Sequence, residues 1–296
     1  MNWHVKCHVV HFDPRPQFRK TQLMILTDPD LKFLSGVVAE FSGNVIPPRQ
    51  AYMLEQQLKP VAKSVGLTSV TELVGKMRKT PSSILSTQVA EAVTVNETSF
   101  FRDNHPFVAL EKKVIPDLIV KNQATKKLRI WCAACSCGQE PYTIAMVLRE
   151  SFPQLKNWKV EIIATDLSDE VLQKSKSGLY SQLEVNRGLP VKKLIKFFDR
   201  NGSNWQVKKE LRDLIQFRRL NLTAAFPQLG EFDVVFIRNV LIYFDQSTKA
   251  QILNRVRRVM RSDGYLFIGS AETTIGLGVP FKREEVDVSV CYRPNN

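Results

Sequence analysis

The sequence predicts an α/β fold built on a doubly wound, mostly parallel sheet. A short apolar run at 128–134 suits a buried central strand, and it leads through small residues into a helical pattern. A second run at 160–165 ends at Asp166, and a third occupies 232–237. Buried strands that alternate with helical stretches are typical of βαβ units, whose strands run parallel.

The turn after the first predicted strand consists of small residues, from Ala133 to Gly138. Small side chains let the backbone approach a ligand, and a helix that begins near Glu140 and Pro141 presents free N–H groups. Proline suits a first helical turn because its missing N–H would be unpaired there. The G-x-G-x-x-G pattern is absent, so this turn alone fits a nucleotide crevice or an ordinary strand–helix crossover.

Asp166 favours the nucleoside interpretation. In doubly wound sheets an acidic residue at the tip of the second strand binds ribose hydroxyls. Its distance from the small-residue turn is roughly the 20 to 30 residues that a βαβ unit needs. Ser168 then suits the cap of a following helix. These features do not distinguish NAD from S-adenosylmethionine.

The composition indicates a cytoplasmic protein. The chain has 296 residues, of which 44% are hydrophobic, enough for one large or two ordinary domains. No apolar run approaches the roughly 18 residues of a membrane span, and the N-terminus lacks the apolar core of a signal peptide. Five cysteines, an odd number, suit a chain with reduced thiols.

Two groups of residues resemble metal ligands, but we expect no metal. Cys132, Cys135 and Cys137 bracket a strand end, and no fourth ligand is suitably spaced, so they are expected to be small apolar fillers. A second group near the N-terminus matches no standard site. It consists of His4, Cys7, His8 and His11.

The net charge of +13 favours an anionic partner. Residues 106–296 carry most of it, with 30 basic and 20 acidic side chains. Nucleic acid, an acidic membrane surface and an acidic protein all remain possible on charge alone.

The pattern along the chain predicts an irregular extension at 1–26 and a helical domain at 27–94. Asp28-Pro29-Asp30 is expected to cap the first of about four helices, and the others are expected at 51–65, 70–79 and 82–93. A linker and a connecting helix, His105 to Val120, would fill 95–126.

The remaining chain, 127–296, is expected to form the cofactor-binding domain. Within it, charged residues and weak strand signals at 178–219 indicate an inserted antiparallel β-subdomain, with a tight turn at Asn201-Gly202. A helix is expected at 247–261 and a strand at 265–268. The alternating Val286, Val288 and Val290 suit a last strand at an antiparallel edge.

Several stretches, taken in order, resemble the chemotaxis receptor methyltransferases of the CheR family, over about Leu26 to Arg293. The stretches are NETSFFR at 96–102, CSCGQEPYT at 135–143, ATDLS at 164–168, the segment from Gly178-Leu179-Tyr180 to Leu189-Pro190, Asn221-Leu222, and FDVVFIRNVLIYFD at 232–245. The ordered set is far more specific than any one motif.

This resemblance implies a class I S-adenosylmethionine-dependent methyltransferase fold joined to an N-terminal helical domain. It implies methyl transfer to glutamate side chains of methyl-accepting chemotaxis receptors, with S-adenosylhomocysteine as the product and no metal. The residues it implies for the cofactor are Asn96, Thr98 and Arg102 from the helical side, Glu140 for the amino end, Asp166 for the ribose, Asn221 and Leu222 for the adenine, and Arg238 and Asn239 near the sulfonium.

Arg102 and Tyr243 are the expected catalytic residues. A glutamate carboxylate is already ionised at neutral pH, so no general base is needed, and the residues must align it with the methyl donor. Arg102 offers a planar two-donor fork to a carboxylate, and the hydroxyl of Tyr243 offers another hydrogen bond.

The expected partner is the acidic helical bundle of a chemotaxis receptor, not nucleic acid or the membrane interior. The hairpin between Phe198 and Val207 looks shorter than in family members that grip a receptor tail peptide. We therefore expect no tethering by a C-terminal pentapeptide. A nucleic-acid methyltransferase would need an aromatic-flanked base pocket of the N/D-P-P-Y type, which the sequence lacks. A catalytically silent receptor adaptor is disfavoured by the intact Arg102, Asp166 and Tyr243.

Overall fold

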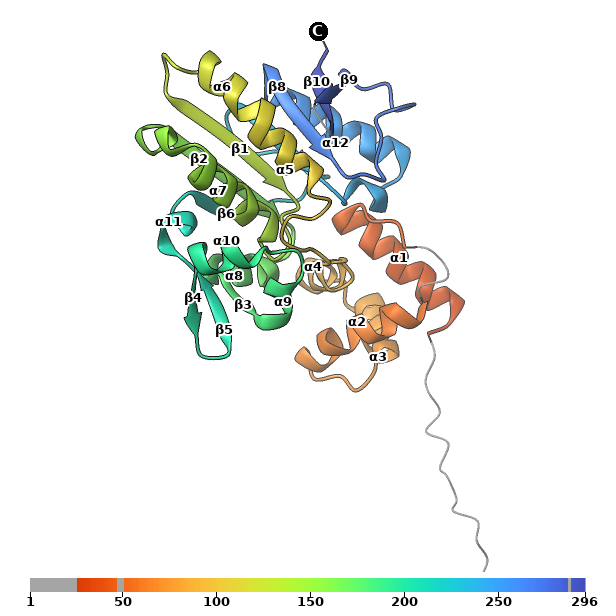
Figure 1. Ribbon diagram of the computed structural model, residues 1–296. Coiled ribbons are helices and arrows are strands. Elements are labelled where there is room, and N and C mark those ends of the chain that lie inside the picture. Colours follow the sequence, from red (N-terminus) through yellow and green to blue (C-terminus); the bar gives the residue numbers. More distant parts are fainter. Residues whose placement is uncertain (1–25, 47–50, 287–288, 296) are drawn as a thin grey trace, which may run out of the picture.

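A computed structural model describes residues 26–46, 51–286 and 289–295 (Figure 1). The sequence-based hypotheses on residues 1–25, including the group of His4, Cys7, His8 and His11, lie outside the described residues. No helix among the described residues is long and apolar enough to cross a membrane.

A seven-stranded sheet organises the chain from Lys127 onward, in the order β6-β2-β1-β7-β8-β10-β9. The first five strands in this order run parallel to one another. Strand β10 runs antiparallel to both of its neighbours, β8 and β9. The predicted mostly parallel α/β fold is confirmed. The bounds are β1 Lys127–Ala133, β2 Lys159–Asp166, β6 Ile215–Arg219, β7 Phe232–Ile237, β8 Met260–Ile268, β9 Phe281–Val286 and β10 Ser289–Pro294.

Central strands are apolar because helices cover both faces of the sheet. Every residue of β7 is buried, as expected for a parallel strand with two covered faces. Helix α7 (Gln139–Ser151) and the α5–α6 segment pack on one face, and α12 (Gln246–Arg258) packs on the other. The predicted helix at 105–120 is present as α5 (His105–Ala109), a π-helical turn η2 (Leu110–Val114) and α6 (Ile115–Lys121).

The end of the chain differs from the expectation of one final edge strand. Val286 ends β9, while Val290 belongs to β10, and the two strands pair with Ser289 opposite Val286. The alternating valines therefore span a hairpin connection. β10 lies inside the sheet between β8 and β9, so β9 is the edge.

The predicted helical domain contains four helices among the described residues: α1 (Asp28–Ser42), α2 (Ala51–Ser64), α3 (Val70–Lys79) and α4 (Ser83–Ala92). They share a hydrophobic core of their own around Leu34, Leu58 and Leu73. The cap of α1 is Thr27 rather than the Asp28-Pro29-Asp30 run, because the Thr27 and Asp30 side chains bond each other's backbone N–H in a capping box.

A smaller three-stranded sheet, ordered β3-β5-β4, lies in the segment after α8 (Asp169–Ser177). Its strands β3 (Leu179–Ser181), β4 (Phe198–Asn201) and β5 (Asn204–Val207) are antiparallel, and a tight turn at Gly202-Ser203 joins the last two. Three short helices accompany it: α9 (Gln182–Asn186), α10 (Val191–Phe197) and α11 (Lys209–Arg212). The predicted bound at 219 is too late, since β6 at 215–219 pairs with β2 in the large sheet.

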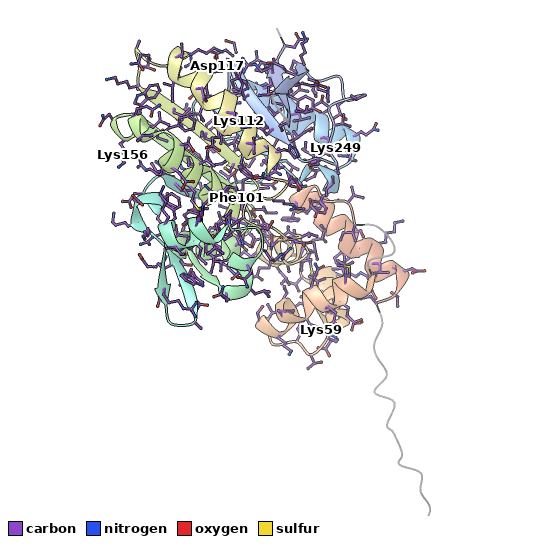
Figure 2. The ribbon with its side chains drawn as sticks, viewed as in Figure 1. Lys59, Phe101, Lys112, Asp117, Lys156 and Lys249 are labelled. Carbon is purple, nitrogen blue, oxygen red and sulfur yellow. The ribbon has the colours of Figure 1, made fainter. Side chains whose placement is uncertain are left out.

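The segment 96–104 joins the small sheet to the large one through two phenylalanines. The buried ring of Phe100 meets Tyr180 and Phe198 edge-on at 5.1 and 5.7 Å between centroids. Phe101, labelled in Figure 2, meets Phe107 of α5 at 5.8 Å and lies under the ammonium of Lys193. Gly188 packs against the backbone of Phe100, where a Cβ would lie 2.1 Å from the carbonyl oxygen.

Replacing Gly188 by alanine should therefore destabilise the protein more than the same change at Gly202. Both glycines have positive φ, +86° and +59°, but a Cβ at Gly202 would meet nothing within 4 Å. We expect Gly202→Ala to cost about 1–2 kcal/mol through backbone strain, and Gly188→Ala about 1–3 kcal/mol more through overpacking. Urea unfolding of both variants measures the difference. Equal losses would contradict the close packing of Gly188 on Phe100.

Candidate cofactor and active site

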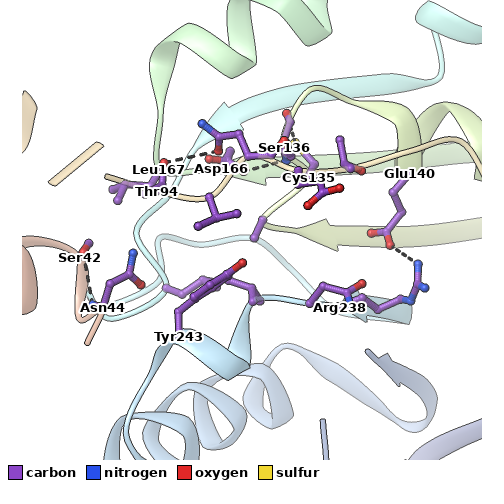
Figure 3. A pocket seen from close by; sticks show the side chains of 18 of the residues that line it. Ser42, Asn44, Thr94, Cys135, Ser136, Glu140, Asp166, Leu167, Arg238 and Tyr243 are labelled. Carbon is purple, nitrogen blue, oxygen red and sulfur yellow. Dashed lines mark hydrogen bonds and ion pairs between the residues drawn. The ribbon is translucent and has the colours of Figure 1, made fainter. Parts of the chain in front are cut away.

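One pocket lies at the carboxyl ends of β1, β2 and β7, between the large sheet and the helical region (Figure 3). It encloses about 890 Å³ of space not filled by atoms, its open mouth included. The fold thus brings every sequence-predicted site residue to a single cavity, which is where doubly wound sheets bind ligands. Those residues are Asn96, Thr98, Arg102, Glu140, Asp166, Asn221, Leu222, Arg238, Asn239 and Tyr243.

The turn after β1 adopts a tight backbone path. Ala134 and Ser136 have φ of 56° and 49°, and Gly138 has φ of 88°. The left-handed conformation is costly for residues with a Cβ, so neighbouring groups must hold it. The hydroxyl of Ser175 donates to the Ser136 carbonyl at 2.9 Å, and that of Tyr180 donates to the Cys137 carbonyl at 2.7 Å. Helix α8 and strand β3 of the inserted segment therefore hold the turn in place.

Asp166 lies at the tip of β2 and is buried. Its carboxylate accepts the backbone N–H of Ser136 at 2.8 Å and that of Ser168 at 3.1 Å. Burial raises the pKa of Asp166, and these backbone N–H groups partly offset that rise. A carboxylate has about four acceptor sites, so it retains capacity for the hydroxyls of a ligand. Ser168 precedes α8 as predicted, but its side chain makes no cap hydrogen bond.

Glu140 and Arg238 form a buried ion pair at the opposite end of the pocket (Figure 3). The guanidinium of Arg238 donates to Glu140 Oε2 at 2.9 Å, to Asp103 Oδ2 at 2.8 Å and to the Arg102 carbonyl at 2.9 Å. Burial raises the pKa of Glu140, and the adjacent Arg238 lowers it. The Nε of Arg238 is buried without a partner among the described residues, so a ligand acceptor would satisfy it.

Arg102 and Tyr243 lie together on the same pocket. Arg102 donates one hydrogen bond, at 2.9 Å, to the Glu97 carbonyl, which leaves other guanidinium donors for a ligand. Burial raises the pKa of Tyr243 above its usual value. Its hydroxyl is therefore protonated at neutral pH and can donate a hydrogen bond.

Asn221 and Asn239 line the pocket but have other bonding partners. The amide of Asn221 donates to the Phe41 carbonyl at 2.7 Å, and its oxygen accepts from Thr223. Its side chain therefore ties α1 to the pocket wall. Asn239 has a φ of 57°, and its backbone N–H donates to Glu272 at 2.9 Å.

Several pocket residues were missed by sequence reasoning. Glu272, which does not itself line the pocket, accepts the backbone N–H groups of Asn239, Gly269 and Ile242 at 2.9, 2.6 and 3.2 Å, and so fixes the loop that ends at Tyr243. No local pattern marks its contact with the pocket loop, because Asn239 and Ile242 lie 33 and 30 residues away in sequence. The pocket residues missed include Ser42, Asn44, Thr94 and Leu220.

Cys132 of β1 and Cys135 of the turn are buried thiols, and Cys137 is half-buried. Burial raises the pKa of Cys132 and Cys135 well above their usual range, and that of Cys137 to a lesser extent. Neutral thiols pack as small apolar groups. No group of three potential metal ligands lies together in the part of the chain that the structure describes.

The comparisons with known proteins agree with this geometry. Residues 96–290 match the family described as "CheR methyltransferase, SAM binding domain". The chain is 39% identical over 256 residues to a chemotaxis protein methyltransferase, Cher2, of Pseudomonas putida, covering 85% of this chain and 92% of that protein. It is 37% identical to one from Pseudomonas aeruginosa (91% and 99% covered) and 32% identical to one from Escherichia coli (85% and 87% covered).

The pocket residues fit S-adenosylmethionine. Asp166 offers free acceptor capacity for ribose hydroxyls, Glu140 offers a carboxylate for an ammonium group, and Arg238 has an unpartnered buried donor for a carboxylate. Leu167, Leu220 and Leu222 provide apolar wall for the base. This donor set is complementary to a nucleoside that carries an amino acid.

Replacing Asp166 by asparagine should weaken the binding of S-adenosylhomocysteine. The amide keeps the size of the side chain but loses the charge and half of the acceptor capacity. We expect a loss of about 1–3 kcal/mol, the cost of leaving buried polar partners unpaired. Calorimetric titration measures it, with Asp199→Asn on the exposed strand β4 as the matched control. An affinity equal to that of the wild type would refute the role of Asp166.

Proposed function

Because this chain belongs to the CheR methyltransferase family, we propose that it transfers the methyl group of S-adenosylmethionine to glutamate side chains of chemotaxis receptors. The observation that carries the proposal is the convergence of two carboxylates, Asp166 and Glu140, with Arg102 and Tyr243 on one pocket. The names of the relatives support chemotaxis proteins as substrates, and glutamate as the acceptor is our own inference.

In this proposal the cofactor supplies an activated methyl group on its sulfonium. Asp166 binds the ribose hydroxyls, and Glu140 binds the amino group while Arg238 holds the Glu140 carboxylate in place. The Nε of Arg238 is free to bind the cofactor's carboxylate. Asn96 and Thr98 line the same pocket from the segment before Arg102. These contacts would hold the cofactor in one orientation in the pocket.

The acceptor glutamate needs orientation rather than deprotonation. Its carboxylate has an ordinary pKa near 4 and is ionised at neutral pH, so a positioned side chain suffices. The planar fork of Arg102 holds the carboxylate through paired donors. Tyr243 keeps its proton because burial raises its pKa, so its hydroxyl donates one further hydrogen bond. Alignment of this kind accounts for a large part of the rate of such a transfer.

We further propose that the receptor's acidic helical bundle docks through charge on the inserted segment, without a tethering pentapeptide. The hairpin that would hold a tail has only Gly202 and Ser203 between its strands. Of the lysines on α10, Lys192 is exposed, whereas Lys193 and Lys196 both pair with Glu150 of α7. The free positive charge of α10 is therefore smaller than the sequence suggests and is concentrated at Lys192.

The first experiment is methylation of receptor-containing membranes with methyl-labelled cofactor. We expect base-labile methyl esters on a receptor-sized band with the wild type, and a loss of at least about 100-fold with Arg102→Ala if the guanidinium holds the acceptor. The melting temperature should stay close to that of the wild type, because Arg102 makes a single hydrogen bond from a half-exposed side chain.

Arg102→Lys keeps the charge but not the fork, so it should recover only a small part of the activity. Label that resists base, or label on nucleic acid, would overturn the proposed acceptor. Full activity of Arg102→Ala would remove Arg102 from the mechanism.

The docking proposal predicts that Lys192→Glu slows association with the receptor and leaves the affinity for S-adenosylhomocysteine unchanged. Rim charges act mainly on association rates, and added salt should weaken the same contact because the Debye length is only about 8 Å at physiological ionic strength. Surface plasmon resonance at two salt concentrations measures both effects. The matched control is Lys249→Glu on α12, which Figure 2 shows far from the inserted segment.

Titration with a receptor C-terminal pentapeptide completes this test. Absence of binding is the expected result. Micromolar binding of the peptide, or an association rate that is insensitive to both salt and Lys192→Glu, would contradict docking by charge alone.

A further inference from the structure

Asn44 is a polar pocket residue to which neither the sequence nor the family match assigns a role, since the match begins at residue 96. It lies in the short segment after α1. That segment is fixed to the pocket wall on both sides of Asn44. The Asn221 amide bonds the Phe41 carbonyl at 2.7 Å, and the Val45 N–H donates to the Tyr243 carbonyl at 2.8 Å.

The position of Asn44 in the pocket identifies which part of a ligand it would meet. Figure 3 shows Asn44 at the end away from Glu140 and Arg238, with Asp166 between the two ends. The charged end suits the amino-acid part of the cofactor, and Asp166 suits the ribose. The base is therefore left for the end at which Asn44 lies.

The surroundings of Asn44 suit a purine ring. Leu220 follows Asp166 in space, because its N–H donates to the Asp166 carbonyl at 2.9 Å. Leu220, Leu222 and Leu167 supply apolar surface for the ring, and a ring buried among them needs polar partners at its edge. The hydroxyl of Thr94, at the same end, already donates to the Glu91 carbonyl at 2.7 Å.

A carboxamide matches the edge of adenine. It carries a donor and an acceptor side by side, while the 6-amino group and the neighbouring ring nitrogen of adenine present an N–H and an acceptor. The backbone N–H of Asn44 bonds Ser42 Oγ at 3.3 Å, but its side-chain amide makes no hydrogen bond with another described residue. This half-buried amide is thus available to a ligand.

We propose that Asn44 recognises the 6-amino edge of the cofactor's adenine. The region of helices α1–α4, and not only the sheet, would then determine which base the enzyme accepts. The inference rests on the proposed function, since it takes S-adenosylmethionine as the ligand. It makes Asn44 a specificity-determining residue that lies outside the matched family domain.

The test is a cycle of four calorimetric titrations on the full chain. Wild type and Asn44→Ala are each titrated with S-adenosylhomocysteine and with its analogue in which hydrogen replaces the 6-amino group. The wild type should bind the analogue about tenfold more weakly, at the lower end of the discrimination that an amide–adenine pair gives. Asn44→Ala should bind both ligands with affinities within about twofold of each other. A difference of that size is the deviation from additivity expected for groups that do not interact.

Glu140→Gln is the matched control from the other end of the pocket. Glu140→Gln should weaken the binding of both ligands and keep the tenfold preference. If Asn44 had only a structural role, Asn44→Ala would likewise weaken the binding of both ligands by the same factor and keep the preference. Retention of the preference by Asn44→Ala, or its absence from the wild type, overturns the assignment. Failure of the wild type to bind S-adenosylhomocysteine would overturn the proposed function as well, so the two failures are distinguishable.

Discussion

The buried guanidinium of Arg238 is the group on which the architecture of the pocket depends. Only 2% of its side chain is exposed, and a buried charge is tolerated only when it is paired and hydrogen-bonded. Its partners come from separate segments, Glu140 at the start of α7 and Asp103 with the Arg102 carbonyl in the 96–104 segment. One cation at the end of β7 thus holds a helix start and a loop against the sheet.

That pairing explains how the 96–104 segment keeps a strained backbone. Phe101, Asp103 and Asn104 have φ of 50°, 62° and 44°, and such residues persist only where the surroundings fix them. Asp103 is fixed by Arg238, while Phe100 is enclosed by aromatic rings of the inserted segment. Arg102 therefore lies between two anchored neighbours, which limits the freedom of its backbone at the pocket.

The sheet could be predicted because its signals are local, and so could the position of Asp166 at a strand tip, whereas most other site residues were expected only from the family resemblance. Apolar runs identify β1, β2 and β7, and the polar residues that follow such strands gather at one edge of any parallel sheet. Contacts between distant segments carried no such signal. Lys193 and Lys196 both pair with Glu150, more than forty residues earlier in the chain, and no local pattern indicates these pairs.

The same limit explains the misplaced strand ends. The alternating valines at 286–290 fit one strand, and nothing in that alternation reveals that Val286 and Val290 belong to two antiparallel strands. Ile215–Arg219 carries two arginines typical of a surface segment, so its pairing with β2 was not apparent. Asn44 reaches the pocket, and Glu272 reaches the backbone of Asn239, only through the packing of distant segments, and no spacing rule could have identified them.

The hairpin at the end of the chain also bears on how the protein avoids self-association. β9 is the outermost strand, and an open strand edge is a template for pairing with another chain. Four consecutive charged, exposed residues occupy its middle, Lys282 to Glu285. A strand from a second chain that paired with β9 would have to pack beside these two positive and two negative side chains and remove their hydrating water. The C-terminal hairpin therefore closes a parallel sheet with an edge that resists aggregation.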